Sequence, residues 1–155
     1  MIVEIVEIVP GPEYKDHVYT QTVVIEFPSG ERLRVEDVTK KCSEEYVSTA
    51  VEVTLVADIA SSVELVSSED LKMDPVDPEV GTGFECLQTN ILDILSKENE
   101  NWFVALELPE GKLNFRFNKQ LVEQLPDEYK PKEGDRLWFE HISNPSFDSI
   151  ESADR

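Results

Sequence analysis

Few residues of this 155-residue chain have the type and spacing that catalysis needs. The two histidines, His17 and His141, are far apart in the sequence, so a metal or acid–base role would require the fold to bring both beside a carboxylate. Serines are common, but none stands in a GxSxG or comparable nucleophile setting. No glycine-rich phosphate loop occurs among the six glycines. The sequence therefore predicts no catalytic residue and a protein that is not an enzyme.

Residues that could bind a metal are equally sparse. Asp74, Asp77 and Glu79 have a spacing faintly similar to that of a calcium loop, but prolines interrupt it and the characteristic glycine and closing glutamate are missing. An acidic linker explains these carboxylates better than a cation site. Cys42 and Cys86 are far apart and lack a CxxC partner, so we expect two reduced thiols. The sequence predicts no metal site and no cofactor.

The aromatic side chains of the second half allow two interpretations, a core or a base-stacking platform such as OB folds use. A platform needs a basic groove around it, and the second half, which holds half of all the bases, is the part that could supply one. Because twelve acidic residues occupy the same segment, 84–142, we favour a core. The candidate nucleic-acid face consists of Lys112, Arg116, Lys119, Arg136 and Trp138.

Negative charge dominates the whole chain. It has 33 acidic against 14 basic residues, a formal net charge of −19, and every segment is negative. Such a surface repels phosphate backbones and anionic membranes. It serves either as a solubility or salt-tolerance device or as a face that binds a basic partner. The candidate partner-binding residues come from the first half, where the acidic excess is largest: Glu31, Glu36, Asp37, Glu44, Glu45, Glu52 and Asp58.

Alternating apolar residues predict the strands that must position these side chains. In the first half we expect strands at 2–9, 18–27, 33–35, 51–59 and 63–66. The turn at 28–30 makes a hairpin, since proline sets φ and glycine accepts a positive φ. Val38, Cys42 and Tyr46 recur every four residues, which predicts a short helix that Asp37 begins.

The second half repeats this scheme. We expect strands at 84–87, 91–95, 102–108, 113–117 and 137–142, with a helical turn at 118–125. Aligning VVIEFPSGERLRV with VALELPEGKLNFRF places Glu26, Pro28 and Gly30 over Glu107, Pro109 and Gly111, at a constant offset of 81 residues. This pattern indicates an internal repeat, although Pro-x-Gly turns also arise by chance in β proteins.

The order of strand, long hairpin, short helix and closing strand is typical of small OB-like or SH3-like barrels. The predicted fold is therefore mostly β with short helices, in two tandem barrels. We expect a first unit at 1–66, an acidic linker at 67–83, a second unit at 84–142 and a polar tail at 143–155. A unit of about 65 residues is marginally stable alone, so the two should lean on each other.

The second half also contains Leu125-Pro126 followed by Lys132-Glu133-Gly134-Asp135 and a strand. In these residues it resembles a family of small bacterial β-barrel domains of unknown function. The resemblance covers about the last 55 residues. It implies a barrel and no activity.

Charge and composition together predict a non-enzymatic acidic module that binds a basic protein, as an inhibitor, an immunity protein or a nucleic-acid mimic does. The alternative is an OB-like nucleic-acid-binding protein that uses the bases of the second half. No membrane segment is expected, since Glu4 and Glu7 interrupt the longest apolar stretch, 2–9, and a span needs about 20 residues. We expect a cytoplasmic protein, in which exposed strand edges could pair two copies.

Overall fold

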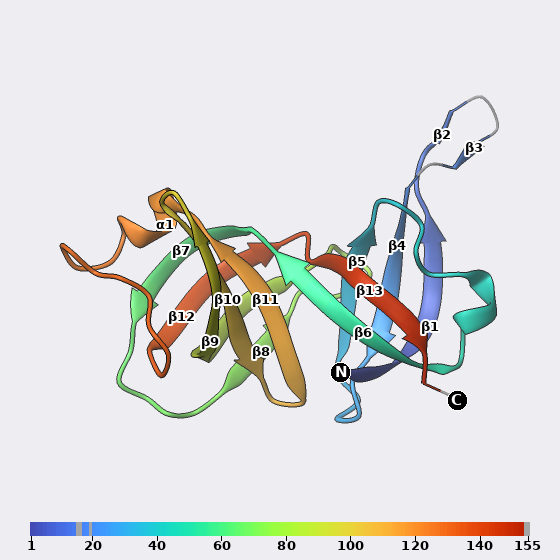
Figure 1. Cartoon of the computed structure of the whole chain (residues 1–155). Helices are drawn as coiled ribbons and strands as arrows, with labels where there is room; N and C mark the ends of the chain where they lie inside the picture. The colour runs from blue at the N-terminus through green and yellow to red at the C-terminus, as the bar shows by residue number, and fades with distance from the viewer. Residues whose placement is uncertain (15–16, 19, 154–155) are drawn as a thin grey trace.

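Strands form almost all of the regular structure (Figure 1). The computed structural model describes residues 1–14, 17–18 and 20–153, with side chains outside 13–19. The predicted fold class, mostly β with short helices and a barrel, is confirmed. The strands are β1 (Ile2–Pro10), β2 (Glu13–Tyr14), β3 (His17–Val18), β4 (Gln21–Glu26), β5 (Arg32–Asp37), β6 (Ala50–Ala57), β7 (Ile59–Leu65), β8 (Lys72–Pro75), β9 (Phe84–Glu98), β10 (Asn101–Leu108), β11 (Gly111–Phe117), β12 (Arg136–Ser143) and β13 (Ser146–Ser152). The helical turns are the 3-10 turn η1 (Glu44–Tyr46) and the α-helical turn α1 (Lys119–Val122).

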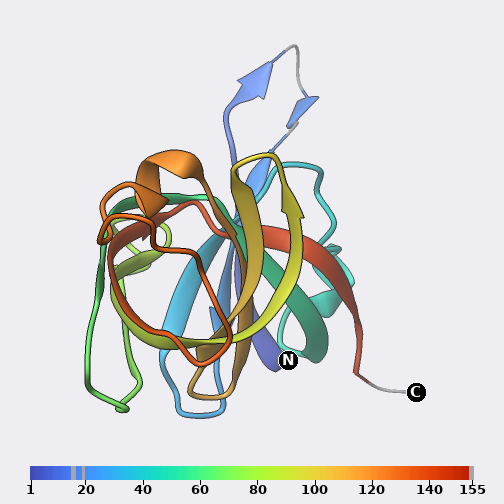
Figure 2. The ribbon, with the colours of Figure 1, turned by 60° about the vertical axis from the view of Figure 1, so that its left-hand side comes forward.

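Five strands on the right of Figure 1 close into a barrel. Around it β1 pairs with β4, β4 with β5, β5 with β13, β13 with β6, and β6 again with β1. On β6 the inward residues Val51, Val53 and Leu55 are buried, whereas Glu52 between them is exposed. This is the period-two pattern from which the sequence predicts a half-buried strand. The ribbon of β2 and β3 projects away from this barrel (Figure 1, Figure 2).

The same sheet continues from β6 into a second curved portion, which forms the other half of the molecule. Here β7 pairs with β12, β12 with β9, β9 with β10, β10 with β11, and β11 in parallel with the end of β6. Its interior holds Phe115, Phe117 and Phe139, whose ring centroids lie 5.0 to 6.2 Å apart. For these three rings the predicted core role is correct. Trp102 and Trp138 are half-buried at the surface.

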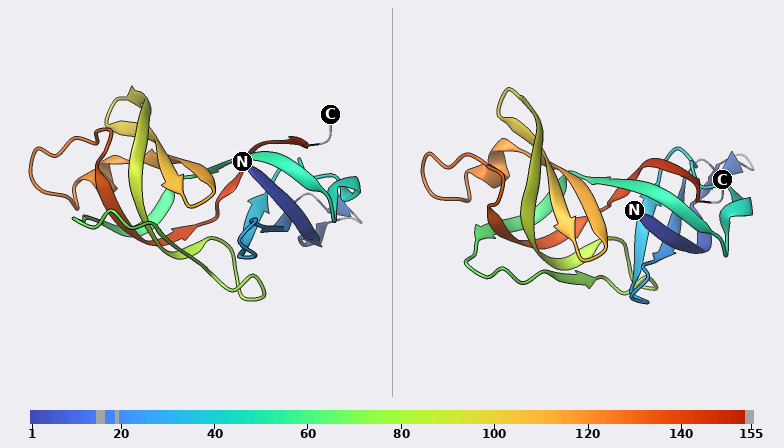
Figure 3. Two further views of the ribbon diagram at one scale, coloured as in Figure 1. Left: turned by 90° about the horizontal axis from the view of Figure 1, so that it is seen from below. Right: turned by 60° about the horizontal axis from the view of Figure 1, so that its bottom comes forward.

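Two long bent strands join the halves (Figure 1, Figure 3). β6 continues through Asp58 into β7, and β12 continues through a short bend into β13. Because β6 pairs with β13 and β7 pairs with β12, each half receives a strand from the other half of the chain. The buried apolar residues accordingly form one core cluster that spans both halves. The halves lean on each other, as their small size requires.

This exchange changes two of the expected segments. The expected polar tail at 143–155 is wrong over Ser146–Ser152, since these residues form β13 and complete the closed barrel. Phe147 in β13 is 5% exposed. The first unit expected at 1–66 ends with β7, which pairs with β12 of the other half. Both differences arise because strand partners are chosen in space, while alternation along the chain reports only burial.

The segment expected as an acidic linker, 67–83, is partly structured. Lys72–Pro75 forms β8, which pairs with β9. Arg34 of β5 holds the following loop, since its guanidinium donates to the Pro78 carbonyl at 3.1 Å and its own carbonyl accepts from the Gly83 amide at 3.1 Å. The segment therefore contacts both halves of the molecule.

The helix expected between Glu36 and Ser48 is wrong except for the short turn η1. Asp37 ends β5 and is buried, and its carboxylate accepts from the backbone amides of Lys41 and Cys42, both at 2.8 Å. These side-chain hydrogen bonds hold a loop in place of a helical ladder. Val38 is 57% exposed, so the four-residue spacing does not mark a buried stripe.

The helical turn expected at 118–125 is confirmed as α1. Asn118 is its N-cap, and its side-chain oxygen accepts from the Leu121 amide at 3.0 Å. The strands expected at 84–87 and 91–95 are one long bent strand, β9. The two predicted hairpins are present as β4–β5 and β10–β11. Their similar pairing agrees with an internal repeat, and duplication stays a prediction.

Candidate functional site

A groove with largely apolar walls lies at the junction of the two halves. It has a volume of about 520 Å³ and lies across neighbouring strands β13, β6, β11, β10 and β9. We call it the junction groove. Its lining residues are Val56, Ala57, Asp58, Leu95, Ser96, Phe103, Asn114, Phe115, Arg116, Asn144, Ser146 and Asp148.

The strand register explains how these side chains meet. Val56 on β6 lies opposite Ser146 of β13 on one side and Asn114 of β11 on the other. Arg116 lies opposite Phe103 of β10. Directly paired residues point to the same side of a sheet, so these side chains share one outward face.

β-Bulges supply three exposed side chains near this face. Between Phe103 and Val104 the partner on β9 steps from Ser96 to Ile94, and so Leu95 is the extra residue. A second shift in the same strand skips Leu92. The two leucines are 45% and 39% exposed, and only Leu95 lines the groove. In β13 the pairing steps over Asp148, which also lines it. Bulges re-aim side chains in this way and are frequent beside functional sites.

Two polar side chains of β11 in the groove make no hydrogen bond or ion pair within the described part of the chain. Arg116 is exposed and its guanidinium contacts no carboxylate there. The side-chain oxygen of Asn114 is buried and has no donor. A buried acceptor without a donor costs free energy. The groove thus offers five guanidinium N–H donors, and one buried acceptor without a donor lies in its wall.

The groove also has a negative rim. Asp58 follows β6 directly, Asp148 lies in the β13 bulge, and both are exposed. The backbone carbonyl of Asp148 accepts from the Lys41 ammonium at 2.9 Å, and no described base contacts its carboxylate. Two carboxylates and one guanidinium give this site a net negative charge.

A second acidic feature crosses the outside of the closed barrel. Glu4 of β1 lies directly opposite Glu26 of β4, and Glu52 of β6 lies opposite Glu151 of β13. Since Glu4 pairs with Ala50, two residues before Glu52, the four glutamates lie on adjacent strands and point outward. We call Glu4, Glu26, Glu52 and Glu151 the acidic row. Arg32 binds Glu26 at 2.9 Å at one end of it.

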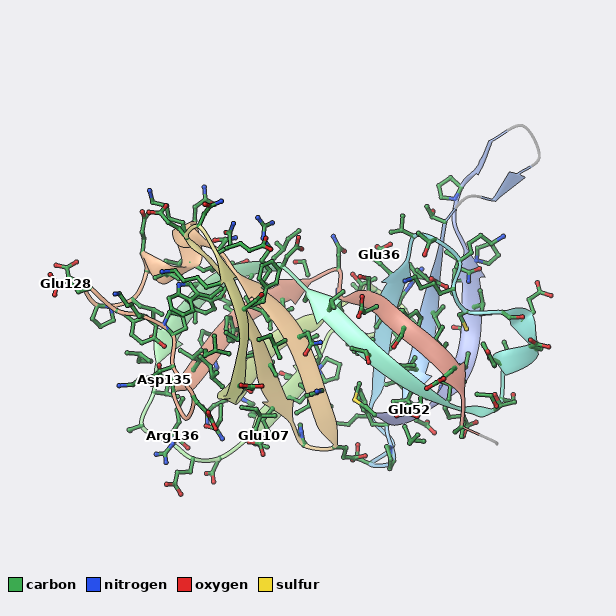
Figure 4. The ribbon with its side chains drawn as sticks, in the orientation of Figure 1. Glu36, Glu52, Glu107, Glu128, Asp135 and Arg136 are labelled. Carbon is green, nitrogen blue, oxygen red and sulfur yellow. The ribbon has the colours of Figure 1, made fainter. Side chains whose placement is uncertain are left out.

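The predicted acidic residues do not form one surface. Asp37 was expected to contact a partner, but it is 2% exposed and its carboxylate accepts from Gln21, Lys41 and Cys42, so its role is structural. Figure 4 shows Glu36 and Glu52 at opposite ends of the closed barrel. The other members are exposed at the β4–β5 turn, in η1 and after β6: Glu31, Glu44, Glu45 and Asp58.

The predicted basic face is also divided. Lys112 and Arg116 lie on β11, whereas Arg136 and Trp138 lie on β12, and β10 and β9 separate these strands. Arg136 binds Glu69 at 2.5 Å, and Lys119 in α1 binds Glu100 at 3.2 Å. Of the four bases, Lys112 and Arg116 therefore lie apart from Trp138, and the other two are already paired with glutamates. Arg116 of the predicted nucleic-acid face and Asp58 of the predicted partner-binding residues both line the junction groove.

The remaining polar candidates have ordinary surroundings. Among the described residues no group of three or more His, Cys, Asp and Glu could hold a metal ion. The side chain of His17 lies outside the described residues, and His141 is exposed beside Glu140 at 3.7 Å. Burial, and secondly the charge of Asp37, raise the pKa of the Cys42 thiol to about 12, so it stays protonated near neutral pH.

Sequence reasoning missed Leu95, Phe103, Asn114 and Asp148. One signal was available for the leucine, since Ile91-Leu92 and Ile94-Leu95 are adjacent apolar pairs that break strict alternation. Such pairs indicate bulges in a long strand. No comparable signal marks Asn114 or Asp148.

No protein-family model and no curated protein sequence matches this chain. The resemblance of the second half to small bacterial β-barrel domains stays a prediction. In the structure its Lys132–Asp135 motif makes a tight turn, in which the Asp135 carboxylate accepts from the Lys132 amide and the Tyr129 hydroxyl. No helix in the described part of the chain is long and apolar enough to cross a membrane.

Proposed function

We propose that this protein is a non-enzymatic, cytoplasmic binding module whose acidic surface binds a basic protein partner. In this role it belongs with inhibitors, immunity proteins and nucleic-acid mimics. Opposite charges accelerate association over long distances, and apolar anchors then slow dissociation.

The acidic row is the observation that carries the proposal. Like charges placed directly opposite each other destabilise a sheet unless other groups offset them. Two such pairs, Glu4 with Glu26 and Glu52 with Glu151, lie side by side on one barrel surface. The row concentrates four carboxylates on one face, with Arg32 bound to Glu26 at its end, whereas carboxylates needed only for solubility require no such alignment. A binding role accounts for their alignment.

The nucleic-acid alternative has less support. Its five residues belong to three separate elements, and two of them, Lys119 and Arg136, already bind glutamates. Phosphate affinity depends on several bases acting together, and each exposed ion pair reduces their number. A gel-shift assay with single-stranded DNA and RNA at low salt tests this alternative. A retarded band would support nucleic-acid binding.

The proposal is tested with protamine as a basic probe, by calorimetry over a series of salt concentrations. We expect binding whose affinity falls steeply as salt increases. The double substitution Glu4→Lys with Glu52→Lys should weaken it at least tenfold more than a matched control. The control is Asp127→Lys with Glu133→Lys, two exposed residues of the loop before β12. Both variants change the net charge equally, so a difference between them reports position.

Equal loss of affinity in the two variants would mean that protamine senses only the overall charge. The acidic surface would then be a solubility device, and the proposed function would be abandoned.

A further inference from the structure

We propose that the junction groove binds an extended peptide segment of the basic partner, in which one large apolar residue stands next to a lysine or arginine. This inference rests on the proposed function and specifies which kind of partner segment the protein binds. The groove supplies three kinds of contact that such a segment satisfies together.

The first contact is apolar. Leu95 is 45% exposed because a bulge turns it out of the β9–β10 ladder, and it lines the groove together with Phe103 and Val56. A large apolar side chain covering these three would remove their surface from water. Bulged apolar residues on an otherwise charged surface favour a site that a partner covers.

The second contact is with a peptide backbone. The buried side-chain oxygen of Asn114 requires a donor, and the Arg116 guanidinium has no described acceptor. An extended backbone presents N–H donors and carbonyl acceptors alternately. Asn114 and Arg116 are two residues apart on β11 and so lie on the same face. A peptide carbonyl can accept from the Arg116 guanidinium, and a neighbouring peptide N–H can reach the Asn114 oxygen once this amide turns toward the groove that it lines.

The third contact is electrostatic and selects the sign of the ligand. Asp58 and Asp148 form the exposed rim; among the described lining residues Arg116 is the one base, and the Lys41 ammonium reaches the Asp148 carbonyl from outside the lining. The chain as a whole carries a net charge of −19. A polyanion is therefore disfavoured, whereas a lysine or arginine beside the apolar residue would meet two carboxylates.

The first part of the test selects ligands without assuming a sequence. A phage-displayed library of random twelve-residue peptides is panned on the full chain. We expect enrichment of peptides with a leucine or an aromatic residue next to lysine or arginine. No enrichment, or enrichment of acidic peptides, would overturn the proposal.

The second part locates the binding site with one selected peptide, labelled with fluorescein and followed by anisotropy. Leu95→Asn should weaken binding at least tenfold. The matched control Leu92→Asn changes the other bulged leucine of the same strand, which does not line the groove, and should change affinity less than twofold. Asp58→Asn should weaken binding and reduce its salt dependence. Equal effects of the two leucine substitutions would place the peptide elsewhere and overturn the proposal.

The outcomes separate this inference from the proposed function. If protamine binding depends on the acidic row while no peptide depends on Leu95, the groove proposal fails and the function stands. If protamine binding shows no such dependence, the proposed function fails. Sedimentation of the free protein tests whether a second copy of the chain occupies the groove instead. A dimer that Leu95→Asn converts to a monomer would show this and would overturn the peptide proposal.

Discussion

The two halves of this molecule follow one pairing scheme and differ in what they place on it. In each half the first strand, β1 or β9, pairs with a hairpin and with a later strand, β6 or β12. In the first half β13 arrives and pairs in parallel with the hairpin strand β5 and antiparallel with β6. In the second half the end of β6 pairs in parallel with the hairpin strand β11 and continues into β7, which is antiparallel to β12. Asp37 and Asn118, which are 81 residues apart like the two hairpins, each accept hydrogen bonds from backbone amides of the segment after the hairpin, a loop in the first half and a helical turn in the second. The shared scheme concerns backbone pairing and capping.

The differences lie in the outward positions and the bulges. The first half carries the acidic row on a closed barrel. The second half packs three phenylalanines inside and turns two leucines outward from its long first strand, β9. One backbone arrangement thus carries a charged surface in one half and an apolar wall in the other. The junction groove forms where the two meet.

The largest expected effect comes from breaking the strand exchange. A chain ending at Ser143 lacks β13, which removes the antiparallel partner of β6 over Val51–Val56, opens the barrel between β5 and β6, and exposes buried core. We expect the closed barrel to unfold, a loss comparable to the stability of a small domain, about 5 kcal/mol or more. Circular dichroism and hydrogen exchange measure it, with a chain ending at Ser152 as control. Amides of β1, β4 and β5 that stay protected from hydrogen exchange in the shorter chain would show that the barrel does not depend on β13.

An intermediate effect compares the two capping residues. Asp37→Ala removes the acceptor of three hydrogen bonds, two buried ones from Gln21 and Cys42 and a partly buried one from Lys41, and should cost about 3 kcal/mol. Asn118→Ala removes a single N-cap bond and should cost about 1 kcal/mol. Urea unfolding of both variants gives the two values. Equal costs would show that burial of Asp37 adds nothing to its capping role.

The smallest effect near neutral pH concerns the buried thiol of the first half. The pKa of Cys42 is about 12 in the folded chain, above its ordinary value of 9.0, because burial and then Asp37 disfavour the thiolate. At a pH between these two pKa values unfolding releases a proton from the thiol. The free energy of unfolding should therefore fall as pH rises from about 9 to about 12. Cys42→Ala should reduce this slope in alkaline urea titrations. An unchanged slope would show that the Cys42 thiol does not cause it. Burial also raises the pKa of Cys86, so Cys86→Ala should reduce the slope separately.

Local elements could be predicted from the sequence because they depend on residues close together in the chain. Alternation identified the buried face of β6, Pro28 to Gly30 identified the first hairpin turn, and Asn118 preceded a real helical turn. The mostly β class and the barrel follow from the same short-range patterns. The phenylalanine core was also predictable, since the surrounding acids argued against a stacking surface.

Contacts between distant segments were decided only in three dimensions. Alternation shows which face of a strand is buried and does not show its partner, so the sequence placed β13 in a tail and gave β7 to the wrong half. Asp37 was predicted at the surface because its hydrogen-bond donor Gln21 is sixteen residues away. The junction groove needs five strands from both halves, and neither half alone brings Asp58, Leu95 and Arg116 together. By itself the sequence determined the charge, the strands and their buried faces, because these are properties of short segments, whereas strand exchange and the groove depend on how those segments pair.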